Sequence, residues 1–204
     1  NGAGDVLAFE AGLIATAPTT RNLAGTISAL DAAALINLGG ANAINVTANT
    51  TLGGAGTGAI TLGAAVVLPD AVTLTLGAGA ASAVSTQAIS GTAAGAVSNL
   101  TINSTALVTI GGAVGTDIGT VTVTNSGGTT FSGAVTATTV TLTNTTGTVT
   151  FTGALNATTL NTAANGYNVT LNGGGAVTNA VTFSNTGSLT IDPSGFTFTG
   201  GAQK

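Results

Sequence analysis

Four aspartates, Asp31, Asp70, Asp117 and Asp192, are the side chains that first invite a catalytic interpretation. Glycosidases use two carboxyl groups that lie roughly 5–9.5 Å apart. Here, successive aspartates are separated by two or more coils of the repeat described below, which places them about 10 Å or more apart. The spacing favours solvated corner residues, and Asp192 in DPSG is typical of a turn. A polysaccharide-binding or tailspike-like β-helix remains an alternative.

The composition removes most other catalytic chemistry. The chain contains no Cys, His, Met or Trp, so it lacks the thiolate and imidazole groups on which most nucleophilic, acid–base and zinc chemistry depends. Glycine-rich pieces such as GGAGTG (53–58) do not complete a dinucleotide fingerprint and lack the lysine of a phosphate loop. We therefore predict that the protein is not an enzyme and has no catalytic, cofactor-binding or metal-binding residues.

The charge of the chain excludes further partners. The net charge is −4, and Arg21 and Lys204 are the two basic residues, so no cationic stripe is available to neutralise the phosphates of a nucleic acid. Uncharged runs such as 32–69 are long enough to cross a bilayer, but Thr, Asn, Gly and Ser interrupt them every few residues. We expect neither nucleic-acid binding nor membrane insertion.

A column of threonines is the second kind of candidate site. Its members, which recur at intervals of about 20 residues, are Thr109, Thr130, Thr150, Thr170 and Thr190. Flat arrays of Thr on solenoids hold ordered water, so the column is a candidate ice-binding face. The simpler interpretation is that Thr suits an uncharged, exposed β face, where stacked hydroxyls also pair with one another. Neighbouring columns vary among Gly, Thr, Asn and Ser, which favours the simpler interpretation.

A repeat of about 20 residues positions these side chains. Units begin near residues 113, 134, 154 and 175. Turns are marked by Asn (125, 144, 165, 185) and Gly (112, 133, 153, 173), which tolerate left-handed backbone angles. Three sets of apolar residues superpose from unit to unit. They are Val114, Val135, Leu155 and Val177; Val121, Val140, Leu160 and Val181; and Phe131, Phe151, Leu171 and Ile191.

Each unit holds two or three short runs in which apolar and polar residues alternate, and this period of two residues indicates strands. A repeat this short cannot bury its apolar side alone, so neighbouring units must stack. The sequence therefore predicts an all-β fold, a right-handed parallel β-helix (β-solenoid) of about eight to ten coils. Aliphatic side chains are expected inside, with Thr and Asn outside.

The chain divides into an atypical beginning and a long solenoid. Residues 1–33 are expected to form an N-terminal cap or irregular first coils, since they carry half of the charged residues and include the Ala-rich ALDAAAL (29–35), which has helical character. Residues 34–204 are expected to form the β-solenoid, most regular from 97 to 200. Before residue 97 the sequence allows strands to be assigned, but not their register. The final FTFTGGAQK predicts a cut through a coil, and the start at Asn1 predicts a processed or excised chain.

Two runs, TVTLTNTTGTVTFTGAL (139–155) and NVTLNGGGAVTNAVTF (168–183), resemble the β-helical passenger regions of bacterial surface proteins. The similar proteins are autotransporters and filamentous-haemagglutinin-like adhesins, with rickettsial surface antigens close in texture, and the resemblance covers roughly residues 97–200. It implies an adhesin, surface coat or stalk at the extracellular face of a bacterial cell. Host surfaces or glycans are the partners that it implies.

We therefore expect a non-enzymatic extracellular structural or adhesive module. A solenoid ends in open strand edges, which must be capped, continued by the remainder of a longer chain, or paired with another copy. Because the chain carries almost no repulsive charge, we expect self-association end to end into a filament.

Overall fold

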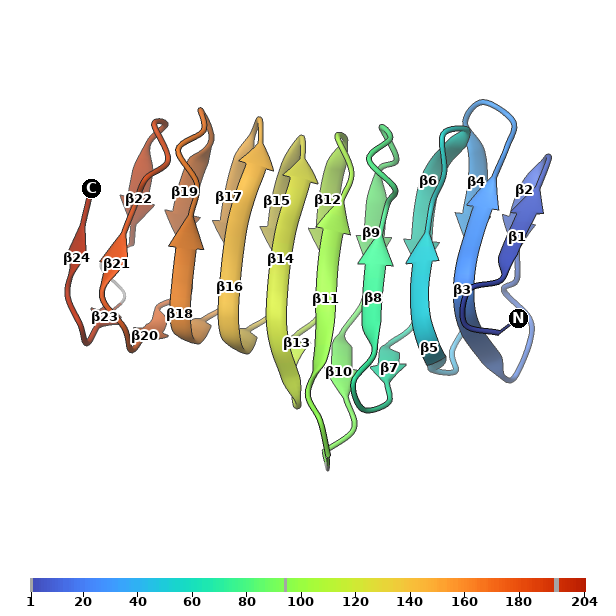
Figure 1. The fold of residues 1–204 in the computed structure, drawn as a ribbon, viewed down its shortest axis with the longest axis horizontal. Coiled ribbons are helices and arrows are strands. Elements are labelled where there is room, and N and C mark those ends of the chain that lie inside the picture. Colours follow the sequence, from blue (N-terminus) through green and yellow to red (C-terminus); the bar gives the residue numbers. More distant parts are fainter. Residues whose placement is uncertain (1, 94, 193–194) are drawn as a thin grey trace.

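The structure, a computed structural model, describes residues 2–93, 95–192 and 195–204. In these ranges it contains strands and no helix, and the strands stack in parallel as a β-solenoid of about 9 turns with a spacing of roughly 21 residues. In Figure 1 the nearer strands run upward and the more distant ones downward while the chain advances from right to left, so the coil is right-handed. No described helix is therefore long and apolar enough to cross a membrane.

Each complete turn passes through three faces. Face 1 contains β7 (Val66–Leu68), β10 (Ile89–Gly91), β13 (Val114–Gly115), β20 (Gly175–Val177) and β23 (Phe196–Phe198). Face 2 contains β1 (Val6–Phe9), β8 (Thr73–Leu76), β11 (Ser98–Asn103) and β14 (Ile118–Ser126), and it is continued beyond β18 (Leu155–Thr162) by β21 (Val181–Thr182) and β24 (Ala202–Gln203), which form a two-stranded sheet of their own. Four longer strands run through both faces: β3 (Arg21–Ala29), β5 (Ile44–Leu52), β16 (Val135–Thr145) and β18.

Face 3 is a separate sheet. It contains β2 (Gly12–Ile14), β4 (Ala34–Asn37), β6 (Thr57–Leu62), β9 (Val84–Thr86), β12 (Leu107–Ile110), β15 (Gly128–Phe131), β17 (Thr148–Phe151), β19 (Asn168–Leu171) and β22 (Leu189–Ile191). Within β16 the alternation of inward and outward residues breaks at Thr138 and Thr139, which both lie outward. This break marks the corner between faces 1 and 2.

The predicted stacking of like residues is confirmed over most of the second half. Val121 pairs with Val140 and Val140 with Leu160, while Phe131 pairs with Phe151. Leu171 and Ile191 continue the last column. The prediction is wrong at Val177, which pairs with Ala157, because Gly175 takes the place over Leu155. The register stays at 20 residues here, and the valine of this unit stands two residues further along its strand than Leu155 does in the preceding unit.

The bore of the solenoid is filled by these columns. Val140, Phe131 and Phe151 are fully buried and Leu160 is 3 % exposed. The rings of Phe131 and Phe151 stack, with centroids 4.9 Å apart and planes 9° from parallel. Each such side chain contributes about 1.5–3 kcal/mol when it leaves water, so the successive turns stabilise one another through their inward faces.

The beginning of the chain differs from the expectation of a helix. Strand β3 ends at Ala29, a turn follows in which Ala33 has a φ of 63°, and β4 begins at Ala34. The Ala-rich stretch 29–35 is thus two strand ends joined by a corner, and the helix prediction is wrong. Helix propensity is a weak preference, and here the stacking of β3 on β5 and of β4 on β6 decides the local structure.

The turn residues occupy corners for reasons other than the predicted left-handed backbone. Gly112, Gly133, Gly153 and Gly173 have no positive φ. A Cβ on Gly153 would lie 2.3 Å from the carbonyl carbon of Gly133, and one on Gly173 would lie 2.2 Å from that of Gly153. These glycines are required because the backbones of adjacent turns approach too closely for any side chain.

Asparagines at another corner form a ladder of side-chain amides. The Nδ2 of Asn125 donates to Oδ1 of Asn103, and the Nδ2 of Asn144 donates to Oδ1 of Asn125, both at 2.6 Å. Among the described residues no Asn has a positive φ, so these asparagines do not use the left-handed angles that Asn tolerates. Asn165 and Asn185 leave the ladder and bond to the carbonyls of Thr143 and Tyr167.

Candidate functional site

Face 3 carries the threonine column that the sequence singles out. Thr109 pairs with Thr130, which pairs with Thr150, and the register continues to Thr170 and Thr190. Thr109 and Thr190 are exposed and the other three are half-buried. In the opposite direction, Thr109 pairs with Ser85 and Ser85 with Thr61. The column is therefore longer than the sequence indicates.

The columns that flank these threonines are mixed. In the column on each side of the threonines, the residue type changes from turn to turn. The first flanking column contains Leu107, Gly128, Thr148, Asn168 and Ser188, and the second contains Gly111, Ser132, Thr152, Asn172 and Asp192. Face 3 thus presents one uniform line of hydroxyls between irregular neighbours.

Face 2 carries a broader array that the sequence interpretation missed. Two outward columns lie side by side on β8, β11, β14, β16 and β18, which follow one another on the near side of Figure 1. One column contains Thr73, Asn99, Thr120, Thr139 and Thr159, and the other contains Thr75, Thr101, Thr122, Thr141 and Asn161. The signal in the sequence is the tripeptide Thr-x-Thr at 73–75, 120–122 and 139–141.

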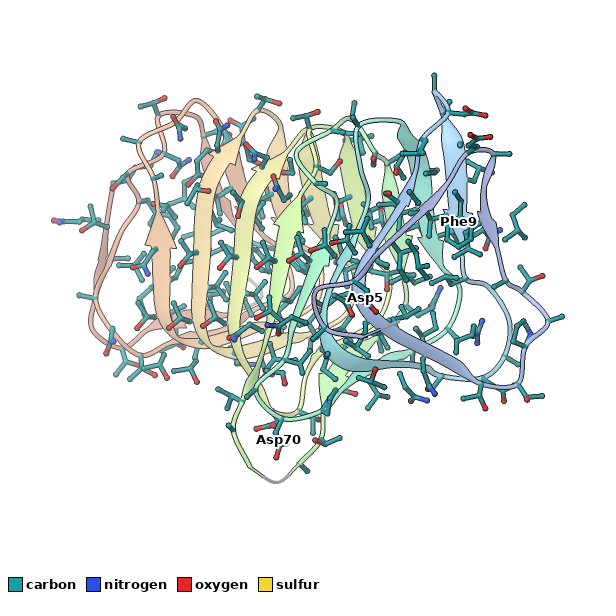
Figure 2. All side chains as sticks on the ribbon, turned by 45° about the vertical axis from the view of Figure 1, so that its right-hand side comes forward. Asp5, Phe9 and Asp70 are labelled. Carbon is teal, nitrogen blue, oxygen red and sulfur yellow. The ribbon has the colours of Figure 1, made fainter. Side chains whose placement is uncertain are left out.

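The aspartates do not converge. Asp70 and Asp117 lie at the corner between faces 1 and 2, on turns that are separated by the turn of β10 and β11. Asp31 lies at a different corner, between β3 and β4. Asp70 accepts a hydrogen bond from Thr92 Oγ1 at 2.9 Å, and Figure 2 shows it on a protruding loop. In the described ranges no three His, Cys, Asp or Glu residues form a group that could hold a metal ion.

Two large polar side chains, those of Arg21 and Tyr167, are buried in the bore together with smaller ones such as Thr86. Arg21 is 5 % exposed and donates to the carbonyl oxygens of Leu38 and Asn42. Tyr167 is fully buried and its hydroxyl donates to the carbonyl of Leu142 at 3.1 Å. Burial raises the pKa of the Tyr167 phenol above its usual value, and hydrogen bonding opposes that shift in part. Both side chains occupy places in the solenoid core.

The two ends of the solenoid present strand edges. In the described part of the chain β1 pairs only with β3 and β2 only with β4, while at the other end β22, β23 and β24 each pair on one side. Apolar side chains lie at both ends: Val6 is 67 % and Ile14 68 % exposed, and Ile191 is 41 % exposed. Figure 2 shows Asp5 and Phe9 on the first turn.

Comparison of the chain with protein-family models, with curated proteins and with solved structures finds no match.

Proposed function

We propose that the protein is a non-enzymatic structural or adhesive module of the bacterial cell surface, which lengthens by stacking its end turns. The observation that supports this proposal most directly is that the solenoid has an open strand edge at each end. Each presents a row of unpaired backbone groups beside exposed apolar side chains, and such an edge is a template for a further strand. The next turn comes from a second copy or from the remainder of a longer chain.

The geometry of the ends supports a head-to-tail contact. All the strand pairs between turns are parallel, and a copy that continues this pattern brings its first turn against the last turn of its neighbour. The two ends are different surfaces, and a contact between different surfaces propagates when it does not close into a ring. A filament of coaxial solenoids is the expected product.

The extracellular location rests on the resemblance in repeat texture and on the lack of Cys, which is compatible with export. A non-enzymatic role is supported by the separation of Asp31 from Asp70 and Asp117 at different corners. Polysaccharide recognition stays a prediction, and so does the ice-binding function of the column from Thr109 to Thr190.

Sedimentation of the purified chain over a range of concentrations, with electron microscopy of the same samples, tests the proposal. We expect species larger than the monomer that grow with concentration, seen as thin filaments. Ile14→Lys places a charge at the first turn and is expected to abolish the growth, since a charge at an edge opposes strand addition. Leu107→Lys is the matched control, because Leu107 is equally exposed at 68 % and lies, like Ile14, on face 3, but on β12, away from both ends.

A monomer at every concentration would contradict the proposal. Equal loss of assembly in the Ile14→Lys and Leu107→Lys variants would contradict it as well, since it would show that a lateral surface carries the contact.

A further inference from the structure

Face 2 holds ten outward positions in two columns across five turns, and eight of them are Thr while two are Asn. Neighbouring strands lie about 4.8 Å apart, and outward residues two apart on one strand are about 6.6 Å apart. The array is therefore periodic in two directions. None of its ten residues is charged or aromatic.

The hydroxyl groups of this array are available to solvent. In the part of the chain that the structure describes, Thr75, Thr101, Thr120, Thr122 and Thr139 make no side-chain hydrogen bond to a protein atom. All five are half-buried, with their backbone fixed in the ladder. A β-branched side chain also has few rotamers open to it. The hydroxyls are thus held at regular positions without a partner from the chain itself.

We propose that face 2 binds ice through ordered water. A surface of ice is a two-dimensional lattice of water molecules, and a flat array of fixed hydroxyls and methyls orders water in two directions at once. Preorganised groups lose little freedom on binding, so many weak contacts add up over the face. This surface lies along the side of the solenoid and does not depend on the contacts between its ends.

An isolated sugar is a poorer fit to this face. Sugars in binding sites stack on exposed aromatic rings, whereas Phe131, Phe151 and Tyr167 are fully buried and no residue of the array is aromatic. The face also has no charge to attract an acidic polysaccharide. Face 3 is less suited than face 2 because only one of its columns is uniform.

Thermal hysteresis measured on three proteins tests the inference. The unchanged chain is expected to depress the freezing point below the melting point. Thr122→Lys combined with Thr141→Lys, an in-register pair on face 2, is expected to remove this gap. Thr130→Lys combined with Thr150→Lys, the pair on face 3 of the same turns, is expected to retain it. Circular dichroism and the melting temperature show whether each variant keeps the fold.

A gentler pair, Thr122→Ser with Thr141→Ser, removes two methyl groups and frees the rotamers, and is expected to lower the hysteresis even if the lysine pair does not fold. No hysteresis in the unchanged chain would overturn the inference. Loss through the face 3 pair alone would also overturn it. A third result would also overturn the inference. If the unchanged chain shows no hysteresis but is retained on microcrystalline cellulose, and the face 2 lysine pair is not retained, face 2 is assigned to a polysaccharide.

Discussion

The earlier and later turns of this solenoid solve the same stacking problem with different lengths of chain. On face 3, Ile60 pairs with Val84 and Val84 with Val108, at a spacing of 24 residues. From Thr129 onward, Val149, Val169 and Leu189 follow at a spacing of 20 residues. In both regions apolar residues lie over apolar residues, as at Val84 and Val108 and at Val169 and Leu189.

The extra residues of the earlier turns lie in their corners. The loop after β7, which includes Asp70, projects beyond the later turns in Figures 1 and 2. In the later turns the corresponding lengths are shorter, and one corner consists of glycines in backbone contact. The difference teaches that the strand register, set by the inward side chains, specifies this fold, while the corners absorb variation in length.

Phe151→Ala is the substitution with the largest expected effect, because it removes a fully buried ring from the tight later turns. We expect a loss of about 3–5 kcal/mol in the free energy of unfolding, measured by urea denaturation. A loss well below this range would contradict tight packing in the later turns, because it would indicate that the neighbouring side chains repack around the missing ring.

Gly153→Ala tests the corner contact directly. The new Cβ would meet the carbonyl carbon of Gly133 at 2.3 Å, and overpacking of this kind costs about 1–3 kcal/mol. Gly166→Ala is the control, since the nearest atom to its new Cβ, Thr186 Oγ1, is 3.9 Å away and its φ is not positive. Equal melting temperatures for the two variants would contradict the close approach of adjacent turns.

Alkaline pH is expected to destabilise the later turns through Tyr167. Because burial raises the pKa of this phenol in the folded chain, its contribution is fully present below the unfolded pKa of about 10 and is lost as the pH rises through the higher folded pKa. Between the unfolded pKa of about 10 and the higher folded pKa, the free energy of unfolding should therefore fall more steeply with pH in the unchanged chain than in the Tyr167→Phe variant. Parallel pH profiles would contradict this role.

Thr86→Val has the smallest expected effect and opposite sign. Thr86 is a 1 % exposed residue that pairs with Leu62 and Ile110 in the earlier turns, and its hydroxyl makes one hydrogen bond of 3.3 Å, to Gln87 O. Replacement by an isosteric apolar side chain is expected to raise the free energy of unfolding by less than about 1 kcal/mol. A clear loss of stability would show that the hydroxyl is needed in this column.

The sequence predicts the later turns well because strand alternation and the 20-residue period coincide there. The paired residues Val121 and Val140, and Phe131 and Phe151, are examples. It does not reveal the register of the earlier turns, since a 24-residue period disappears when units are aligned at 20. Val177 is misplaced for a different reason, because the apolar pattern matches it to Leu155 as the next apolar residue, whereas Gly175 takes the place over Leu155.

Other features depend on contacts between turns and have no local signal. The glycines at 133 and 153 follow from backbone approach, and the asparagines at 125 and 144 from amide pairing. Both kinds of residue look like ordinary turn residues in the sequence. The double column of face 2 was accessible as a repeated Thr-x-Thr, but only the register shows that these tripeptides lie side by side.

The central claim is that one register runs through earlier and later turns alike. Spin labels at Thr61→Cys and Thr170→Cys, on the same column of face 3, measure it by pulsed electron paramagnetic resonance. The column passes from Thr61 through Ser85, Thr109, Thr130 and Thr150 to Thr170, so five steps of about 4.8 Å predict a distance of about 24 Å. A distribution centred well away from this value, or too broad to have a centre, would contradict the account.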